Sequence, residues 1–319
     1  MDNLTHSLVG ALLGQAGLKR KTGLAMPALI IGANLPDVDA ACLFWLEGQE
    51  HLGFRRGITH GPPALVLLPL VLAGLLWGYD RWQARRGTRP EGQLPVHFGW
   101  LFLLSFIGCL THPALDWLNV YGIRLLEPFS SQWFYGDTLF IIDVWLWALM
   151  GFATWFSLRR ERRGGEWMRP ARIAIAVSLA YVGLNGVITA TAFGKSREPY
   201  PEEYIASPVP LKFWEREHIA GLYTGVWLSS TWDGADFGYG YRMMAGTQCV
   251  LPDLTDARAT NSQIDAFLFW SRAPFAERAP DGSVILRDAR FYDPRARDRF
   301  SVPLPHVKCE PMSEELPGG

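Results

Sequence analysis

The sequence predicts a mainly α-helical membrane bundle followed by a small antiparallel β domain. Residues 1–193 are dominated by apolar runs, whereas residues 194–319 have the composition of an ordinary water-soluble protein. Many of the fourteen tryptophans fall near the ends of apolar runs, where the aromatic belt of a membrane protein lies. The net charge of −1 gives no reason to expect a nucleic-acid partner.

Four apolar runs are long enough to cross a bilayer, which takes about 20 residues. They are residues 62–79, 98–118, 139–158 and 171–193. Two earlier runs, 7–18 and 24–33, are shorter, and the second ends at Asn-Leu-Pro-Asp-Val-Asp (34–39), where the proline discourages helix continuation. Short or broken helices at membrane depth need surrounding protein or a water-filled cavity. We therefore expect six helical segments, of which four are firm spans.

Basic residues in short loops predict the orientation of the spans. Clusters at 19–21, 81–89 and 159–172 all face the cytoplasm if the spans alternate. The outward-facing parts are then the N-terminus and residues 40–60, 119–138 and 194–319. Arg55 and Arg56 lie on the outer side against this rule, so they need another explanation.

The C-terminal half is predicted to be a β domain over residues 213–310, preceded by a proline-rich linker at 196–212 that follows the helical domain of residues 1–195. Residues 311–319 are expected to be a disordered tail. The predicted strands are 225–232, 237–245, 265–271, 283–292 and 299–303, with Asp-Gly turns between some of them. Cys249 and Cys309 could form a disulfide if this half is extracytoplasmic, although sequence cannot establish the pairing.

Ionisable and amide side chains lie within or beside the apolar runs, where even a lenient scale assigns each charge a cost of about 2.5–3.5 kcal/mol. The candidate metal ligands are His6, Asp37, Asp39, His60, His112 and Asp116, and the neighbouring polar residues are Asn34, Asn119, Asp137 and Asp143. On the predicted topology they all fall on the outer side or in the outer half of the membrane. Shared ligation of a cation would offset the cost of burying them.

The spacing of these residues favours a metal site. His112 and Asp116 are four residues apart, which places both on one helix face. Imidazole and carboxylate are suitable ligands for Zn²⁺ or a similar divalent ion. Asp37 and Asp39 add two carboxylates after the proline break. Three histidines with two to four aspartates suit a hydrolytic centre, in which metal polarises a phosphoryl or carbonyl oxygen and acidifies a water.

Structural interpretations stay open for each residue alone. A buried histidine is often simply hydrogen-bonded in a core, Asp37 could cap a helix, and Asp143 could cap the helix that follows it. Arg55, Arg56 and Arg124 would lie at the outer face, where arginine can bind phosphate in bidentate fashion. Their alternative role is to extend along apolar surface towards water.

Several short motifs resemble the YdjM family of bacterial inner-membrane proteins. They include Leu-Thr-His-Ser (4–7), residues 34–39, Arg-Gly-Ile-Thr-His (56–60), His-Pro-Ala-Leu-Asp (112–116) and Asn-Val-Tyr-Gly (119–122), and a downstream block at 128–143 also matches. The resemblance covers about residues 1–195, and the C-terminal part is similar to the β extension of longer members. It implies a bacterial inner-membrane protein described as a metal-dependent hydrolase.

The family is in turn distantly similar to zinc-dependent phospholipase C and related single-strand nucleases. The order of His6, Asp37 or Asp39, His60, His112 and Asp116 matches the first part of the ligand series in those enzymes. Their later histidine and glutamate ligands have no clear equivalents here, although Asp137 and Asp143 could substitute. The resemblance therefore implies one or two metal ions.

The leading hypothesis is a metal-dependent hydrolase in the bacterial inner membrane, acting at the periplasmic face on a phosphoester of a lipid or lipid-linked substrate. Asp137 or Asp143 would act in catalysis, and Asn34 and Asn119 would support the ligands. A second hypothesis is a non-catalytic, metal-stabilised scaffold whose β domain binds a protein partner. A third, ion- or proton-coupled transport, ranks last because we find one broken helix and no second, related half.

Overall fold

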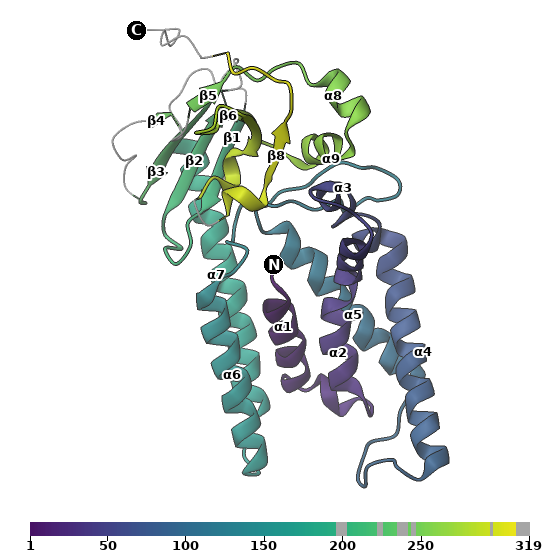
Figure 1. The fold of residues 1–319 in the computed structure, drawn as a ribbon. Helices are drawn as coiled ribbons and strands as arrows, with labels where there is room; N and C mark the ends of the chain where they lie inside the picture. The colour runs from purple at the N-terminus through teal and green to yellow at the C-terminus, as the bar shows by residue number, and fades with distance from the viewer. Residues whose placement is uncertain (196–202, 222–225, 235–241, 244–246, 294–295, 311–319) are drawn as a thin grey trace. The chain divides into compact units, whose positions relative to one another are not determined.

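A computed structural model describes residues 1–195, 203–221, 226–234, 242–243, 247–293 and 296–310 (Figure 1). These residues belong to two compact units, one formed by 1–39 and 56–187 and the other by the described parts of 40–55 and 188–319. The first unit is helical and the second contains the strands, as the sequence predicts. Residues 40–55, however, belong with the C-terminal unit, although they lie between two membrane helices in the sequence.

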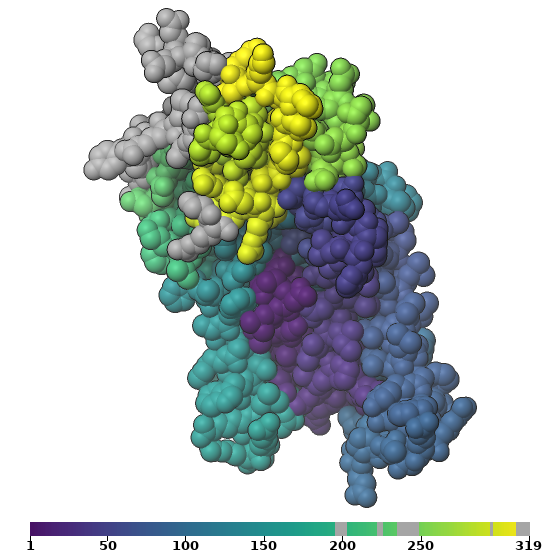
Figure 2. All heavy atoms as spheres, viewed as in Figure 1, coloured from purple at the N-terminus to yellow at the C-terminus, as the bar shows by residue number. Residues whose placement is uncertain are grey.

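The six expected helical segments are present, although residues 40–44 of the second and 188–195 of the last belong to the second unit. They are α1 (Asn3–Gln15), α2 (Ala25–Asn34) with the 3₁₀ segment η2 (Leu35–Phe44), α4 (Pro62–Arg86), α5 (Phe98–Trp117), α6 (Val144–Arg162) and α7 (Met168–Lys195). Shorter 3₁₀ turns are η1 (Leu18–Arg20) and η3 (Ile58–His60). Helix α1 packs on α6, and Figure 2 shows the purple N-terminal segment beside the teal residues that include this helix.

Among the described residues, four helical stretches are long and apolar enough to cross a membrane: Ala25–Phe44, Pro62–Arg86, Phe98–Trp117 and Met168–Gly194. Three of them match predicted spans. The first differs, because the helix at 34–39 tightens into a 3₁₀ segment instead of ending, so that α2 and η2 together are long enough.

Helix α6 is not among these four, although the sequence predicts a span at 139–158. Asp143 accepts hydrogen bonds from the backbone amides of Trp145 and Leu146, so the helix begins at Val144. Because the helix starts this late, any part of it long enough to cross a membrane includes charged residues such as Arg160.

Glycines bring α1, α2 and α5 together at short distances. A Cβ atom added at Gly108 of α5 would lie 2.6 Å from the carbonyl oxygen of Leu29, and one at Gly32 would lie 2.7 Å from that of Ser105. One at Gly10 of α1 would also lie 2.7 Å from the Leu29 oxygen. Small residues of this kind allow membrane helices to approach backbone to backbone. This packing fixes the C-terminal half of α2 against α5.

The described residues of the second unit form two four-stranded antiparallel sheets. The first has the order β1 (Glu203–Pro208), β2 (Arg216–Gly221), β3 (Trp227–Trp232) and β4 (Arg242–Met243), and the second has β5 (Thr247–Cys249), β6 (Pro274–Arg278), β7 (Val284–Asp288) and β8 (Ser301–Leu304). Ile205 pairs with Ile219 across the first sheet, and both pack in one core cluster with Phe275 of the second. Cys249 and Cys309 form a disulfide.

Two predictions about this unit are wrong. Strand β1 lies inside the stretch 196–212, which the sequence assigns to a linker. Residues 265–271 fall largely in helix α9 (Ser262–Trp270), because Asn261 caps its N-terminus and the buried residues Ile264, Phe267 and Trp270 recur every third position.

The other predicted strands have mixed outcomes. The stretches 225–232 and 299–303 correspond to β3 and β8, and 283–292 becomes β7 followed by the 3₁₀ turn η4 (Ala289–Phe291). Most of 237–245 and the tail 311–319 lie outside the described residues. Helix α8 (Thr255–Thr260) precedes α9, which packs against α3 (Glu50–Phe54).

Candidate metal centre

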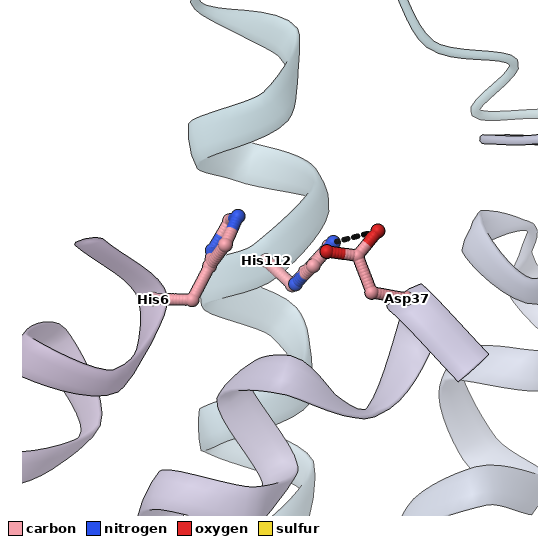
Figure 3. A group of neighbouring side chains, drawn as sticks. All are labelled: His6, Asp37 and His112. Carbon is pink, nitrogen blue, oxygen red and sulfur yellow. Dashed lines mark ion pairs between the residues drawn. The ribbon is translucent and has the colours of Figure 1, made fainter. Parts of the chain in front are cut away.

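Five of the six predicted metal ligands converge at one end of the helical unit. His6 comes from α1, Asp37 from η2 and His112 from α5, and their side chains face one another in Figure 3. His60 of η3 and Asp116, one turn beyond His112 on α5, form a second group with His112. In each group of three, one ligand atom of every residue lies within 4.8 Å of the others. The i, i+4 spacing on α5 therefore places His112 and Asp116 on one helix face, as predicted.

Asp116 lies at the centre of the cluster. Its Oδ1 atom is 3.4 Å from Nε2 of His6, and its Oδ2 atom is 3.7 Å from Nε2 of His60 and 3.5 Å from Nε2 of His112. The three histidines and Asp116 are all fully buried, and the rings of His6 and His112 stack with centroids 3.8 Å apart. Asp37 is less enclosed and lies 3.8 Å from Nε2 of His112.

The same carboxylate also attracts cationic groups. Nε of Arg56 lies 3.0 Å from Oδ2 of Asp116, and the amino group of Met1 donates to Oδ1. The Asp116 carboxylate therefore attracts two cationic groups, the Arg56 guanidinium and the Met1 amino group.

Three ligand atoms of the cluster form no hydrogen bond in the described structure: the Nε2 atoms of His6, His60 and His112. A buried polar atom without a hydrogen bond costs about 1–3 kcal/mol. Coordination of one divalent cation would satisfy several of these atoms at once. Imidazole nitrogens with carboxylate oxygens are also a donor set that Zn²⁺ accepts. The residues present therefore fit a metal ion.

The ring of His112 is held in the orientation that ligation requires. Its Nδ1 atom lies 2.8 Å from the carbonyl oxygen of Ala33, the residue that α2 brings against α5. A carbonyl can only accept, so Nδ1 carries the proton and Nε2 keeps its lone pair towards the cluster. Metal-binding histidines are regularly oriented in this way by an acceptor behind the ring.

His60 is oriented by a chain of two side chains. Its Nδ1 atom lies 3.0 Å from the hydroxyl of Thr59, and that hydroxyl donates to Oδ2 of Asp39 at 3.1 Å. The backbone amide of Arg56 donates to the same oxygen at 2.7 Å. Asp39 therefore lies behind His60 and belongs to neither ligand group. Burial lowers the pKa of His60, which keeps the ring neutral as ligation requires.

His6 is positioned by the capping of α1. The Asp2 side chain accepts from the amides of Leu4 and Thr5, and also from the Thr5 hydroxyl at 2.6 Å. Trp147 of α6 donates to the Thr5 hydroxyl at 2.9 Å. These contacts fix the first turn of α1, and with it His6, against α6.

The predicted arginines have protein partners. Arg56 donates to the side-chain oxygen of Asn119 and the carbonyl of Gly122, and its guanidinium stacks on Tyr121. Arg124 pairs with Glu127 at 2.8 Å, and burial lowers its pKa. Both side chains are nearly buried, with 7% of Arg56 and 7% of Arg124 exposed. Arg55 belongs to the second unit, where it caps the C-terminus of α3.

The two predicted catalytic aspartates differ. Asp143 caps α6 and accepts from the Tyr181 hydroxyl at 3.0 Å, so its contacts favour the capping role that the sequence also allows. Asp137 is buried, with a positive φ of 47°, in the segment between α5 and α6. Asn34 donates to Ser7 and to the carbonyl of Ile30, and contacts no ligand directly through these bonds.

Sequence reasoning missed Thr59, Asp2, Thr5 and the Ala33 carbonyl as orienting groups. Asp2 could have been found, because an aspartate just before an apolar helical run is a common N-cap. A backbone carbonyl has no signature in sequence.

The family model described as "YdjM inner membrane protein" matches residues 1–192, which include every residue of the cluster. The chain belongs to the YdjM family. It is also 27% identical over 141 residues to "Uncharacterized protein YfhP" of Bacillus subtilis (strain 168), an alignment that covers 42% of this chain and 39% of that protein. No solved structure matches the chain.

Proposed function

We propose that this YdjM-family protein is a metal-dependent hydrolase of the bacterial inner membrane that cleaves a phosphoester of a lipid or lipid-linked substrate at the periplasmic face. The observation that most supports the proposal is the convergence of three buried imidazole Nε2 atoms on one carboxylate, two of them oriented through Nδ1. A divalent cation held there supplies Lewis-acid polarisation of a phosphoryl oxygen and an acidified water.

The residues of the chain have separable roles in this proposal. His6, His60, His112 and Asp116 hold the metal, with Zn²⁺ as the expected ion and Asp37 completing a second position if two ions bind. Thr59 and Asp39 hold His60. Asp137 is proposed as the general base. Arg124, in the segment between α5 and α6, is proposed as the contact for substrate phosphate. Arg56 neutralises Asp116 in addition to any contact with substrate.

The periplasmic orientation is supported by the three basic loop clusters and by the disulfide of the second unit. Disulfides form and persist in oxidising compartments and are rare in the cytosol. The proposed centre would then open towards the outer leaflet, where a lipid-linked phosphoester is within reach.

The test is hydrolysis by the full chain in detergent micelles that contain phosphatidylglycerol and a polyprenyl diphosphate. The protein is stripped with a chelator and reloaded with Zn²⁺ or Mn²⁺, and products are measured by mass spectrometry. We expect metal-dependent release of a phosphorylated product that falls at least about a hundredfold in His60→Ala, as loss of a catalytic group does. His97→Ala, at an exposed loop position, should retain full activity.

A metal-stabilised scaffold is the second candidate, and complete burial of the three histidines and Asp116 favours it. Structural metal sites are closed, whereas catalytic sites keep one position open. Protein that binds metal and melts at a lower temperature without it, yet releases no product from either lipid, would establish the scaffold over the hydrolase.

A further inference from the structure

The helical unit also has a groove between the C-terminal part of α6 and the N-terminal part of α7. A groove of about 450 Å³ runs between these helices, within the roughly 300–1,000 Å³ range of small-molecule sites. Its apolar wall includes Phe152, Phe156, Ile173 and Val177. Phe152 is 63% exposed and Ile173 is 54% exposed, so the groove is open along its side.

The groove has one polar end. Arg160, at the C-terminal end of α6, and Arg169, in the first turn of α7, line it together with Glu166. Arg160 lies over the ring of Phe156, 5.7 Å from its centroid. Within the described ranges, neither Arg160 nor Arg169 forms an ion pair with a carboxylate. Two arginine side chains are therefore available at the mouth of an apolar channel.

The depth of the groove suits a hydrocarbon chain. Leu149, at its far end, is eleven residues before Arg160, which corresponds to about 16 Å of α-helix. Helix α7, which supplies Ile173 and Val177, is one of the candidate membrane spans, so its side of the groove would face acyl chains in a bilayer. The groove thus combines a cationic end with an apolar length of roughly half a bilayer's hydrocarbon core, which is about 30 Å thick.

The polar end lies at the level of the membrane interface. Trp167 follows Glu166 in the sequence and carries Lys19 over its ring at 4.2 Å from the centroid, and Arg159, next to Arg160, lies over Trp155. Tryptophan and basic side chains gather where headgroups lie. Residues 159–172 contain six arginines and two glutamates, a net charge of +4. This charge favours an anionic headgroup over a zwitterionic one.

We propose that the groove between α6 and α7 binds one anionic phospholipid from the leaflet that the basic helix ends face. One acyl chain lies along Phe152, Ile173 and Val177, and the phosphate lies between Arg160 and Arg169. The carboxylate of Glu166 accepts a hydrogen bond from a hydroxyl of the headgroup, which favours phosphatidylglycerol among anionic lipids. This site is independent of the proposed hydrolase, because it shares no residue with the metal cluster.

Native mass spectrometry of the full chain in detergent, titrated with phosphatidylglycerol or phosphatidylcholine of the same acyl length, tests the proposal. We expect the first phosphatidylglycerol to bind about thirtyfold more tightly. That ratio equals roughly 2 kcal/mol, as expected from about 1 kcal/mol for each of two arginines. The double variant Arg160→Gln/Arg169→Gln should lose most of this preference.

The matched control is Arg85→Gln/Arg86→Gln at the exposed end of α4, which removes the same charge elsewhere and should keep the preference. Val177→Trp, which fills the apolar wall without changing charge, should weaken phosphatidylglycerol binding at least about tenfold even if the arginine variant proves unstable. Equal binding of the two lipids, equal loss in the α4 control, or full competition by inorganic phosphate would overturn the proposal.

Discussion

Two of the three histidines in the cluster, His112 and His60, are oriented by a neighbour behind the imidazole ring. The Ala33 carbonyl fixes the ring of His112, and the Thr59 hydroxyl links His60 to Asp39. Without such partners an imidazole can rotate or change tautomer, which lowers its affinity for metal. The arrangement places three Nε2 atoms around Asp116, with Asp39 linked to His60 through the Thr59 hydroxyl.

Thr59→Val tests this support directly. The substitution keeps the side-chain shape but removes the hydroxyl between His60 and Asp39. Loss of such an orienting group typically lowers metal affinity by about 10–100-fold. Chelator competition on the purified protein should show that decrease. Thr154→Val is the control, because the Thr154 hydroxyl of α6 forms no hydrogen bond, and equal affinity losses in both variants would refute the supporting role.

A second residue-scale prediction concerns His218 on β2, which is fully buried. Burial lowers its pKa to about 4, against a contact with the Ala192 backbone that raises it. Between pH 6.5 and 4 the unfolded chain therefore binds a proton that the native chain does not. Stability contributed by neutral His218 is complete above pH 6.5 and falls as pH decreases, by up to about 1.4 kcal/mol per pH unit.

Denaturant unfolding of the second unit between pH 7 and 5 measures this effect. His218→Gln should show a shallower loss of stability than the natural chain over that window, whereas His306→Asn, at an exposed position, should not. Burial raises the pKa of the adjacent Glu217, which acts in the opposite direction in all three proteins and cancels in the comparison. Identical slopes for the natural chain and His218→Gln would contradict the assignment.

At this scale the sequence predicts which candidate ligands converge better than it predicts the residues that orient them. His112 and Asp116 follow from a spacing that one helix converts into a shared face, and His6, His60 and Asp37 follow from polar residues that have no reason to lie beside apolar runs. The roles of Thr59 and Ala33 depend on how three segments meet, which local sequence does not encode.

Among the elements, the pairing of α2 with α5 positions the cluster. Gly32 and Gly108 allow the two backbones to approach until the Ala33 carbonyl reaches His112. The contact is therefore a consequence of helix packing rather than of either helix alone.

Gly108→Val should separate these helices. The added side chain would meet the Leu29 carbonyl and the Ala33 amide, so the Ala33–His112 hydrogen bond should be lost and metal content should fall by more than half. Metal analysis with size-exclusion chromatography measures both binding and folding. Gly99→Val is the control on the same helix, because a Cβ atom at Gly99 meets nothing within 4 Å. Full metal content in Gly108→Val would show that close approach is not required.

One element boundary and one element type were predicted wrongly for the same reason. The start of α6 depends on the Asp143 cap, and hydropathy extended the predicted span back to residue 139. Residues 265–271 have strand-forming composition, yet their buried positions follow a helical period once Asn261 caps the segment. In both places a single capping side chain determined the outcome.

For the whole molecule, the two units differ in how they are held together. The helical unit relies on bilayer and helix packing, and the second unit has two sheets closed by the Cys249–Cys309 disulfide. The sequence predicts this division because composition changes near residue 194. It could not predict that residues 40–55 join the second unit, since their contact with α9 connects segments far apart in the chain.

The proposed topology places the second unit in the periplasm. Alkaline phosphatase fused after residue 310 should therefore be active in cells, and a fusion in the loop at residue 90 should be inactive. An inactive fusion after residue 310 would reverse the orientation.

Loss of the disulfide in Cys249→Ser/Cys309→Ser should lower the stability of the second unit by about 4 kcal/mol, given the 60-residue separation.

The central claim is that the buried histidines and Asp116 bind a metal ion. Elemental analysis of the detergent-purified full chain by inductively coupled plasma mass spectrometry tests it most directly, alongside His112→Ala, Asp116→Ala and the control His97→Ala. The account predicts one or two divalent ions, chiefly zinc, per natural chain and per control chain, and almost none in either cluster variant. A natural chain without metal, or unchanged metal in both cluster variants, would contradict it.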